Sequence, residues 1–271
     1  RVHHHHRSVA GLDLKSCREF FIRSLHRACD PEPRSCSVFS MPGTTVIILR
    51  HGERMDAVNK EWMGSNRDRP FDPPLTERGA AMGFKAGEAI QDIIKKENLP
   101  PISRIFSSPL IRCVQTVAEV KKSVGFDGPI NPEPALAEII FEEWYRSWGV
   151  PGTTGQWGGP PNCGLGVPVA KEDLHPGCLR PAGELYLTPT KLTEKLGDII
   201  SQEYEPQLPS SAVTYCWGNV ETPEQGRARV GRFAEHCAEK YPGETVVMCS
   251  HGGPTSMMYQ ALGKTTEELE S

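Results

Sequence analysis

The sequence predicts an α/β protein, a three-layer α/β/α sandwich whose mostly parallel sheet has helices on both faces. Three short apolar runs have the length and composition of strands that are buried on both faces. Amphipathic helical patterns alternate with these runs, which is typical of a parallel sheet covered by helices. The composition is that of a globular protein, with 38% hydrophobic and 24% charged residues in a chain of 271.

The first 40 residues stand apart from this pattern. His3 to His6 resemble a purification tag and are excluded from fold reasoning. We predict that residues 1–40 are a tag remnant and a poorly ordered leader, in which residues 16–29 have the pattern of a short amphipathic helix. An Arg-rich targeting helix is the alternative, and the acidic residues of the segment count against it. The folded domain is expected over residues 41–271.

The first elements of this domain follow in order from residue 44. The β-branched run Thr45–Leu49 predicts a strand buried on both faces. Thr76 is a typical helix cap, and the apolar spacing after it predicts a helix that reaches Ile94. The segment Arg104–Ser107 predicts the second strand. We expect Ser108 as the N-cap of the next helix, with a proline at its first position.

A long irregular insertion is expected next, at about residues 141–187. Fifteen of the 39 residues at 149–187 are Gly or Pro, which is too many for regular structure. Three of the five tryptophans, Trp144, Trp148 and Trp157, lie in or beside this stretch. Because aromatic residues suggest packing, we expect an ordered flap and not a linker.

The last third of the domain returns to alternating helices and strands. Two helix starts are marked by a threonine followed by a proline, and the second of them has a capping-box pattern. The expected elements are helices over Thr188–Ile200 and Thr222–Tyr241, a third buried strand over Glu244–Cys249, and a last helix that begins at Gly252.

Three polar clusters directly follow the three predicted strands. They begin at Arg50, Ser107 and Ser250. Because the carboxyl ends of parallel strands open on one crevice, clusters that are far apart in the sequence are expected to meet there. Arginines, histidines and helix N-termini together favour a doubly negative oxyanion such as phosphate. The candidate pocket residues are Arg50, His51, Arg54, Arg112 and His251.

His51 is the candidate nucleophile of this pocket. An imidazole nitrogen can attack phosphorus and form a phosphohistidine, which water then hydrolyses. The attacking nitrogen must be unprotonated, and neighbouring guanidinium groups disfavour the imidazolium form. The three arginines would stabilise charge on the equatorial oxygens in the transition state, and His251 could donate to the same oxygens.

The motifs LRHGER, PLTERG, SSPLIRCVQT and CSHGG resemble those of the histidine phosphatase superfamily, also called phosphoglycerate-mutase-like. The resemblance covers residues 44 to about 265 and implies a phosphoglycerate-mutase-like fold. It implies that the five pocket residues bind phosphate and that His51 is phosphorylated. RHGER, RCVQT, EPALAE and the tryptophan-bearing segment after them resemble in particular the phosphatase domains of the Sts type and the ecdysteroid-phosphate phosphatases.

A proton donor to the leaving oxygen is also required. The superfamily takes it from a carboxylate after the next strand, and Glu138 matches that position best. Glu142 and Glu143 are rivals only four and five residues further on. A general acid needs a raised pKa at neutral pH, which desolvation by Trp144 and Trp148 would supply.

We favour a phosphomonoester phosphatase over two alternatives. One is a cofactor-dependent phosphoglycerate mutase. Such mutases commonly carry RHGES and ERHYG, whereas this chain has Glu53 and Arg54 and lacks ERHYG. The other is a non-catalytic phosphate-binding or scaffold module, which the loss of a pocket residue would indicate, and none of the five is lost.

Composition and motif content also restrict the cofactors and partners. We expect no cofactor and no metal, because no Asp/His/Cys cluster has metal-ligand spacing. The expected partner is a phosphorylated substrate, either a phosphotyrosine protein or a small phosphate ester, and a homodimer is left open. A net charge of −4 argues against nucleic acid, and no apolar run approaches the roughly 18 residues of a membrane span. The nine cysteines show no CxxC spacing, and most of them are expected to be reduced thiols in a cytoplasmic protein.

Overall fold

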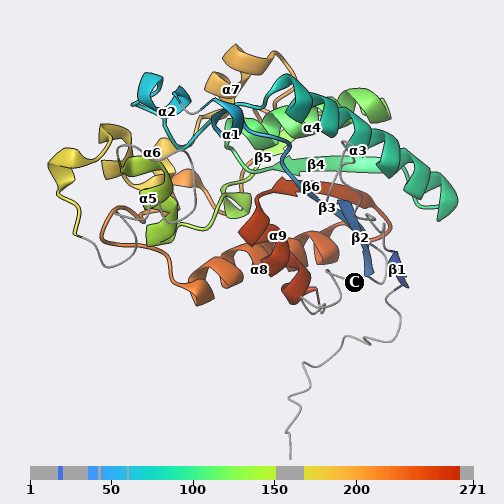
Figure 1. Cartoon of the computed structure of the whole chain (residues 1–271). Coiled ribbons are helices and arrows are strands. Elements are labelled where there is room, and N and C mark those ends of the chain that lie inside the picture. Colours follow the sequence, from blue (N-terminus) through green and yellow to red (C-terminus); the bar gives the residue numbers. More distant parts are fainter. Residues whose placement is uncertain (1–17, 21–35, 42–43, 60, 151–167, 263–271) are drawn as a thin grey trace, which may run out of the picture.

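A mixed sheet forms the centre of the protein, with antiparallel strands added at one edge (Figure 1). The computed structural model describes residues 18–20, 36–41, 44–59, 61–150 and 168–262. Within these residues the strand order is β1-β2-β3-β6-β4-β5. The strands are β1 (Arg18–Phe20), β2 (Cys36–Met41), β3 (Thr44–Arg50), β4 (Ile102–Ser107), β5 (Ile130–Pro132) and β6 (Thr245–Ser250). Since β3, β6, β4 and β5 are parallel neighbours, the predicted mostly parallel sheet is confirmed.

Helices cover both faces of this sheet. One face packs against α3 (Glu77–Lys96) and α4 (Ile111–Val124), and the other packs against α8 (Pro223–Lys240) and α9 (Gly252–Ala261). The side chains of β3 alternate between the two cores: Ile47 and Leu49 belong to the first, and Val46 and Ile48 to the second. This alternation is the pattern of a strand buried on both faces, and the three-layer sandwich is confirmed.

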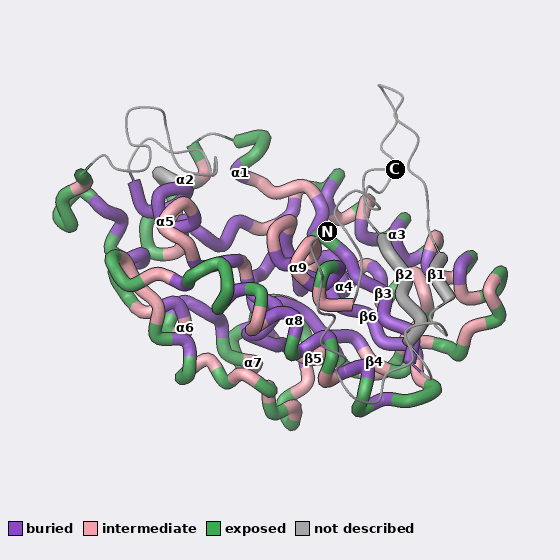
Figure 2. Tube along the Cα trace, turned by 90° about the horizontal axis from the view of Figure 1, so that it is seen from below, coloured by how far each residue is buried: buried purple, intermediate pink, exposed green. Residues whose placement is uncertain are grey.

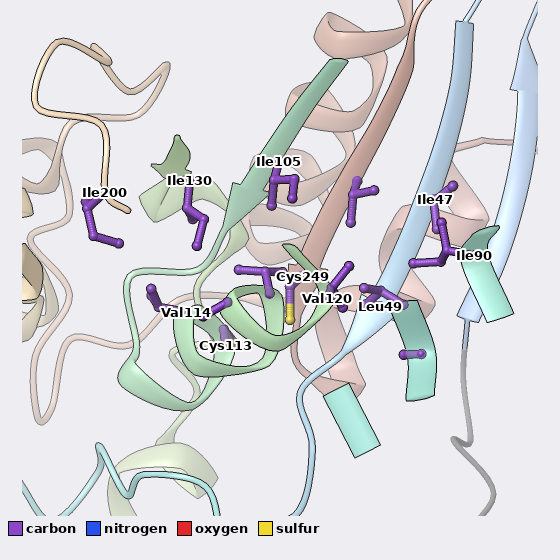
Figure 3. Packing of buried hydrophobic residues seen from close by; sticks show 14 of the residues in the cluster. Ile47, Leu49, Ile90, Ile105, Cys113, Val114, Val120, Ile130, Ile200 and Cys249 are labelled. Carbon is purple, nitrogen blue, oxygen red and sulfur yellow. The ribbon is translucent and has the colours of Figure 1, made fainter. Parts of the chain in front are cut away.

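The first of these cores is shown from close by in Figure 3. Ile47 and Leu49 of β3 lie in it with Ile90 of α3 and with Val114 and Val120 of α4. Figure 2 shows that the traces of β3 and β6 are buried, whereas exposed segments lie at the periphery. The cores on the two faces of the sheet therefore hold the central strands in place. The positions of the residues that directly follow these strands are fixed as a result.

The predicted helix caps are confirmed at three places. Thr76, Thr188 and Thr222 each accept a hydrogen bond from the backbone N–H three residues further on, and the capping box at Thr222 is complete. The shorter helices are α1 (Met55–Val58), α2 (Trp62–Ser65), α5 (Glu142–Gly149), α6 (Ala182–Leu185) and α7 (Pro189–Leu196). Single 3₁₀ turns are η2 (Pro134–Leu136), η4 (Lys171–Asp173), η5 (Pro176–Leu179) and η6 (Ser210–Ala212).

The structure differs from the predicted leader at two places. Residues 18–20 form β1 and residues 36–40 belong to β2, whereas a poorly ordered segment, helical at most over 16–29, was expected. These residues form strands because they pair with the sheet. β2 satisfies the backbone hydrogen-bonding groups along the edge of β3, and β1 in turn pairs with β2. The rest of residues 1–40 lies outside the described residues.

The predicted cap of α4 is wrong. The helix begins at Ile111 with Leu110 as N-cap, and no side chain of that cap accepts a hydrogen bond. Instead, the carboxylate of Asp72 accepts a hydrogen bond of 2.7 Å from the backbone N–H of Ile111. A residue remote in sequence thus caps this helix, and the hydroxyl of Ser108 is left for another partner.

The helix predicted over Thr188–Ile200 ends earlier than expected. It stops at Leu196 because Gly197 has a positive φ of 84°, which continues no right-handed helix. Ile200 lies beyond the helix, in a parallel bridge with Ile130. Its apolar character therefore reflects a place in the core beside the sheet.

The predicted insertion at residues 141–187 is ordered where the structure describes it. It begins with α5, a regular helix that was not expected, and residues 168–187 contain only short helical turns. Residues 151–167 lie outside the described residues. The domain boundaries at residues 41 and 271 stay predictions.

Candidate active site

The carboxyl ends of β3, β6 and β4 lie side by side, and the polar clusters that follow them meet there. The parallel register pairs Arg50 with Ser250, and Ser107 with Cys249. The rings of His51 and His251 consequently lie edge to face, with 5.2 Å between their centroids. The structure thus brings together residues from opposite ends of the domain at the predicted crevice.

His51 is buried at the end of β3 in a fixed tautomeric form. Its Nδ1 lies 2.8 Å from the carbonyl oxygen of Gly52. Because a carbonyl only accepts, Nδ1 carries the proton and Nε2 keeps its lone pair. Burial, followed by the positive charge of Arg112, holds the pKa of His51 well below its ordinary value. The ring is therefore neutral at neutral pH, and Nε2 is the nitrogen available for attack.

The loop after His51 is held by the first turn of α3 and by α4. A Cβ on Gly52 would collide with the carbonyl oxygen of Gly79, so the two backbones touch only because neither residue has a side chain. The N–H of Gly52 donates to Thr116 Oγ1 at 3.0 Å, and Thr76 Oγ1 donates to the carboxylate of Glu53 at 2.8 Å. Thr116 is the last residue of the motif RCVQT, but the sequence alone assigned it no role, because its partner Gly52 lies 64 residues away.

Arg112 lies at the bottom of the site and is fully buried. It donates from Nη1 to the carbonyl oxygen of Phe71 at 3.0 Å and from Nη2 to His251 Nδ1 at 3.2 Å. Its guanidinium carbon lies 5.7 Å from the ring centroid of Trp148. A buried arginine with these neutral partners keeps its positive charge largely uncompensated, which favours an anion beside it.

Arg54 lies beside Arg112 and pairs with the carboxylate of Asp56. Its Nε and Nη2 donate to the carboxylate of Asp56 at 3.1 and 3.2 Å, and its guanidinium carbon lies 4.9 Å from the ring centroid of Trp148. Burial and the charge of Arg112 both lower the pKa of Arg54. Arg50 lies at the mouth of the site, where it is exposed and close to Gly252 at the start of α9. All three arginines thus lie close enough to His51 for their charges to lower its pKa.

His251 is the N-cap residue of α9 and is also fully buried. Its Nδ1 accepts from Arg112, so its Nε2 carries the proton and donates to Ser108 Oγ at 2.9 Å. Ser108 Oγ also accepts a hydrogen bond of 3.4 Å from the backbone N–H of Leu110, the residue before α4 begins. Burial and the charge of Arg112 lower the pKa of His251 well below its ordinary value, which keeps the ring neutral without a ligand.

Glu138 is the carboxylate that the structure places at this pocket. Its Oε2 lies 3.7 Å from His251 Nδ1, and its Oε1 accepts from the backbone N–H of Ile139 at 3.0 Å. Burial raises the pKa of Glu138, and the charge of Arg112 partly opposes that rise. The rival Glu142 instead pairs with Arg146 on α5 at 2.6 Å.

The two tryptophans that were expected to close the pocket have different positions. Trp148 lies against both Arg54 and Arg112 and so forms a wall of the site. Trp144 packs against Phe71 and Tyr145, in the core behind the site. Only one of the two therefore shields the pocket directly.

Comparison with known proteins agrees with this geometry. The model of the histidine phosphatase superfamily (branch 1) matches residues 46–148 and 191–270, which is more than half of the chain. The chain belongs to the histidine phosphatase superfamily. The resemblance drawn from the motifs is thereby confirmed, and the two matched segments contain all five pocket residues and Glu138.

The chain is similar to the ubiquitin-associated and SH3 domain-containing protein B of the mouse (Mus musculus), which is a protein of the Sts type. The two chains are 30% identical over 132 residues, which is 37% of this chain and 20% of the relative. The matched part is thus a fifth of that longer protein.

Solved structures of more distant proteins are similar as well. A putative alpha-ribazole-5'-P phosphatase from Escherichia coli is 16% identical, with a TM-score of 0.41 over 83% of this chain and 82% of that one. A phosphoserine phosphatase from Entamoeba histolytica, in complex with 3-phosphoglyceric acid, is 17% identical, with a TM-score of 0.41 over 80% and 79%.

The described residues contain neither a membrane-spanning helix nor a metal-binding group of side chains. None of their helices has the length and apolar character to cross a bilayer. They also contain no group of three or more His, Cys, Asp or Glu side chains arranged to hold a metal ion. The cytoplasmic location, the absence of a cofactor and the homodimer stay predictions.

Proposed function

We propose that this protein is a phosphomonoester phosphatase that acts through a phosphohistidine on His51. The observation that carries the proposal is a neutral, buried histidine with a fixed tautomer in a pocket of three arginines. Such a pocket attracts a phosphate dianion and presents an unprotonated nitrogen to it. The proposed substrate is a phosphorylated protein side chain or a small phosphate ester.

The first step forms a bond between His51 Nε2 and phosphorus and breaks the bond from phosphorus to the leaving oxygen. Glu138, in its protonated form, gives its proton to that oxygen, so the product leaves as an alcohol or phenol. The raised pKa of Glu138 favours the protonated form that this step needs.

The second step returns the enzyme to its starting state. The carboxylate of Glu138 takes a proton from water, the water oxygen attacks phosphorus, and the bond between phosphorus and Nε2 breaks. Inorganic phosphate is released, and both His51 and Glu138 regain their first forms.

The arginines and His251 stabilise the phosphoryl oxygens in both steps. A dianion beside His251 favours its protonated form, because an opposite charge raises the pKa of an imidazole. The imidazolium can then donate from Nδ1, the nitrogen that faces Arg112 and Glu138. The helix N-terminus at His251 adds partial positive charge on the same side.

Glu138→Gln tests the general acid. We expect hydrolysis of an alkyl phosphate to fall by about 10²-fold or more, because a poor leaving group needs the proton. Hydrolysis of p-nitrophenyl phosphate, whose leaving group departs without help, should fall much less. In the native enzyme the alkyl phosphate rate should decline as pH rises through the pKa of Glu138, and the variant should lose this alkaline limb. The measurement is kcat/KM for both substrates across pH, because kcat/KM reports the step that releases the leaving group and excludes the later dephosphorylation, in which Glu138 also acts.

Glu142→Gln and Glu143→Gln are the matched controls for this variant. Glu142 is paired with Arg146, and neither change should produce a dependence on the leaving group. If one of them does so and Glu138→Gln does not, the general acid has been assigned to the wrong glutamate. The pocket assignment rests on other residues and would be unaffected.

Hydrolysis is expected to need no added metal, because arginines and histidines supply the positive charge at the phosphate. The native protein should hydrolyse p-nitrophenyl phosphate at the same rate before and after treatment with EDTA and dialysis. A rate that EDTA abolishes and Mg²⁺ or Zn²⁺ restores would overturn the metal-free mechanism. A phosphoglycerate mutase assay on the same sample tests the alternative transfer reaction.

A further inference from the structure

A buried ion pair lies directly behind the loop that carries Glu138. Arg229 of α8 donates to the carboxylate of Glu221 from Nε at 2.7 Å and from Nη2 at 2.8 Å. The side chains are only 7% and 0% exposed, and the chemistry described above uses neither. We propose that this pair positions Glu138 for proton transfer, an inference that rests on the proposed function.

Arg229 holds the loop on the N-terminal side of the carboxylate and at the residue itself. Its Nη1 donates to the carbonyl oxygens of Ala135 at 2.9 Å and Ala137 at 3.0 Å. Its Nη2 donates to the carbonyl oxygen of Glu138 at 3.2 Å. One planar guanidinium therefore fixes three main-chain oxygens of the loop relative to one another.

Glu221 holds the same loop on the C-terminal side. Its carboxylate accepts from the backbone N–H of Ile140 at 3.1 Å, and its own backbone N–H donates to the carbonyl oxygen of Ile140 at 2.8 Å. The pair thus binds the main chain both before and after Glu138. The only helical turn in this stretch is η2, so side chains supply the partners that regular structure would otherwise provide.

The cost of burying such a pair argues for a role beyond stability. The free-energy cost of removing two charges from water offsets much of their mutual attraction. Well-packed apolar residues of similar volume therefore often stabilise a core as much as a buried ion pair does, or more. A bidentate pair with further hydrogen bonds instead fixes the position and the orientation of the main-chain groups that it holds. A proton donor needs both, because it must lie within hydrogen-bond reach of the leaving oxygen, and a displacement of about 1 Å can cost about 10²-fold in rate.

Several charged and titratable groups face Glu138 besides this pair. His251 and the three pocket arginines face it from β3, α4 and the start of α9, and Tyr186 is close enough to interact with its charge. Variants that test the pair must leave all of these in place, so that a changed pH profile can be assigned to the loop.

Arg229→Lys tests whether the ion pair positions Glu138. Lysine keeps a positive charge beside Glu221 but cannot bridge the carboxylate and three carbonyl oxygens with one planar group. We expect kcat/KM for an alkyl phosphate to fall about tenfold or more, whereas kcat/KM for p-nitrophenyl phosphate and inhibition by vanadate stay close to native. The alkaline limb for the alkyl phosphate should also move. Arg227→Lys is the matched control: this exposed arginine of the same helix donates to Gln260 at 3.3 Å, away from the loop.

A cavity beside the pair permits a second test. It has a volume of about 440 Å³, and Ala135, Glu221 and Arg229 are among the residues that line it. Arg229→Ala would extend this space to the position of the missing guanidinium. Guanidinium ion at a low, non-denaturing concentration should then restore alkyl phosphate hydrolysis selectively, and methylammonium should restore it less.

Each outcome separates this inference from the proposed function. Equal slowing of both substrates by Arg229→Lys, with weaker vanadate inhibition and a lower melting temperature, would make the pair a general structural element and overturn the inference alone. The same holds if Glu138→Gln discriminates between the two leaving groups and Arg229→Lys does not. If the native protein hydrolyses neither substrate, the proposed function fails and the inference fails with it.

Discussion

Replacing His51 by alanine is expected to abolish turnover, with a loss in kcat/KM of about 10⁴-fold or more. In the proposed mechanism Nε2 of this residue forms the bond to phosphorus, and its fixed tautomer and lowered pKa suit it to that attack. The native enzyme, quenched during turnover of a radiolabelled phosphate ester, should yield a protein-bound phosphate that is labile in acid and stable in base. The variant should yield none.

His236→Ala is the matched control for this experiment. His236 lies on α8, is half-buried, and belongs to none of the strand ends that meet at the pocket. Its removal should leave both the rate and the labelled intermediate unchanged. Near-native turnover by His51→Ala would show that the nucleophile has been assigned wrongly, whatever the fate of the label.

Arg112→Ala should lower kcat/KM by about 10²- to 10³-fold, as the loss of one preorganised donor to a charged transition state typically does. Vanadate should bind the variant correspondingly more weakly. Arg112 also makes the largest electrostatic contribution that lowers the pKa of His51. Without it this pKa rises, so the acidic limb of kcat/KM should move to higher pH, because only the unprotonated ring attacks.

Two comparisons separate this effect from loss of structure. Arg112 is buried and donates to Phe71, so the melting temperature must be measured beside the kinetics, and Arg112→Lys retains the charge in nearly the same volume. Arg104→Ala is the control, since this arginine of β4 pairs with Glu244 near the opposite end of the sheet. If Arg112→Ala retained the native kcat/KM, the assignment of Arg112 to the phosphate pocket would be wrong.

The parts of the fold that the sequence predicts well are those specified by neighbouring residues. The apolar run at Thr45–Leu49 becomes β3, and Thr76 and Thr222 cap the helices that follow them. The pocket is predictable for a related reason. Polar residues directly after parallel strands must face the same crevice, so the positions of His51 and His251 follow from the strands alone.

The parts that escape prediction depend on partners remote in the sequence. Asp72 caps α4, and Ser108 is thereby free to bond His251, so a correct reading of local cap chemistry still names the wrong residue. β2 forms because β3 offers an unpaired edge. Arg229 and Glu221 lie more than eighty residues from the loop that they hold, and no spacing rule connects them to it.

The order of strands has a consequence for when activity can arise. β6 is the last strand of the described chain, yet it lies in the middle of the sheet between β3 and β4. A nascent chain that still lacks β6 has two unpaired inner edges and no His251, so the pairing of β6 completes the sheet and the pocket together. A chain in which β6 has not yet paired therefore has neither a complete sheet nor a complete pocket.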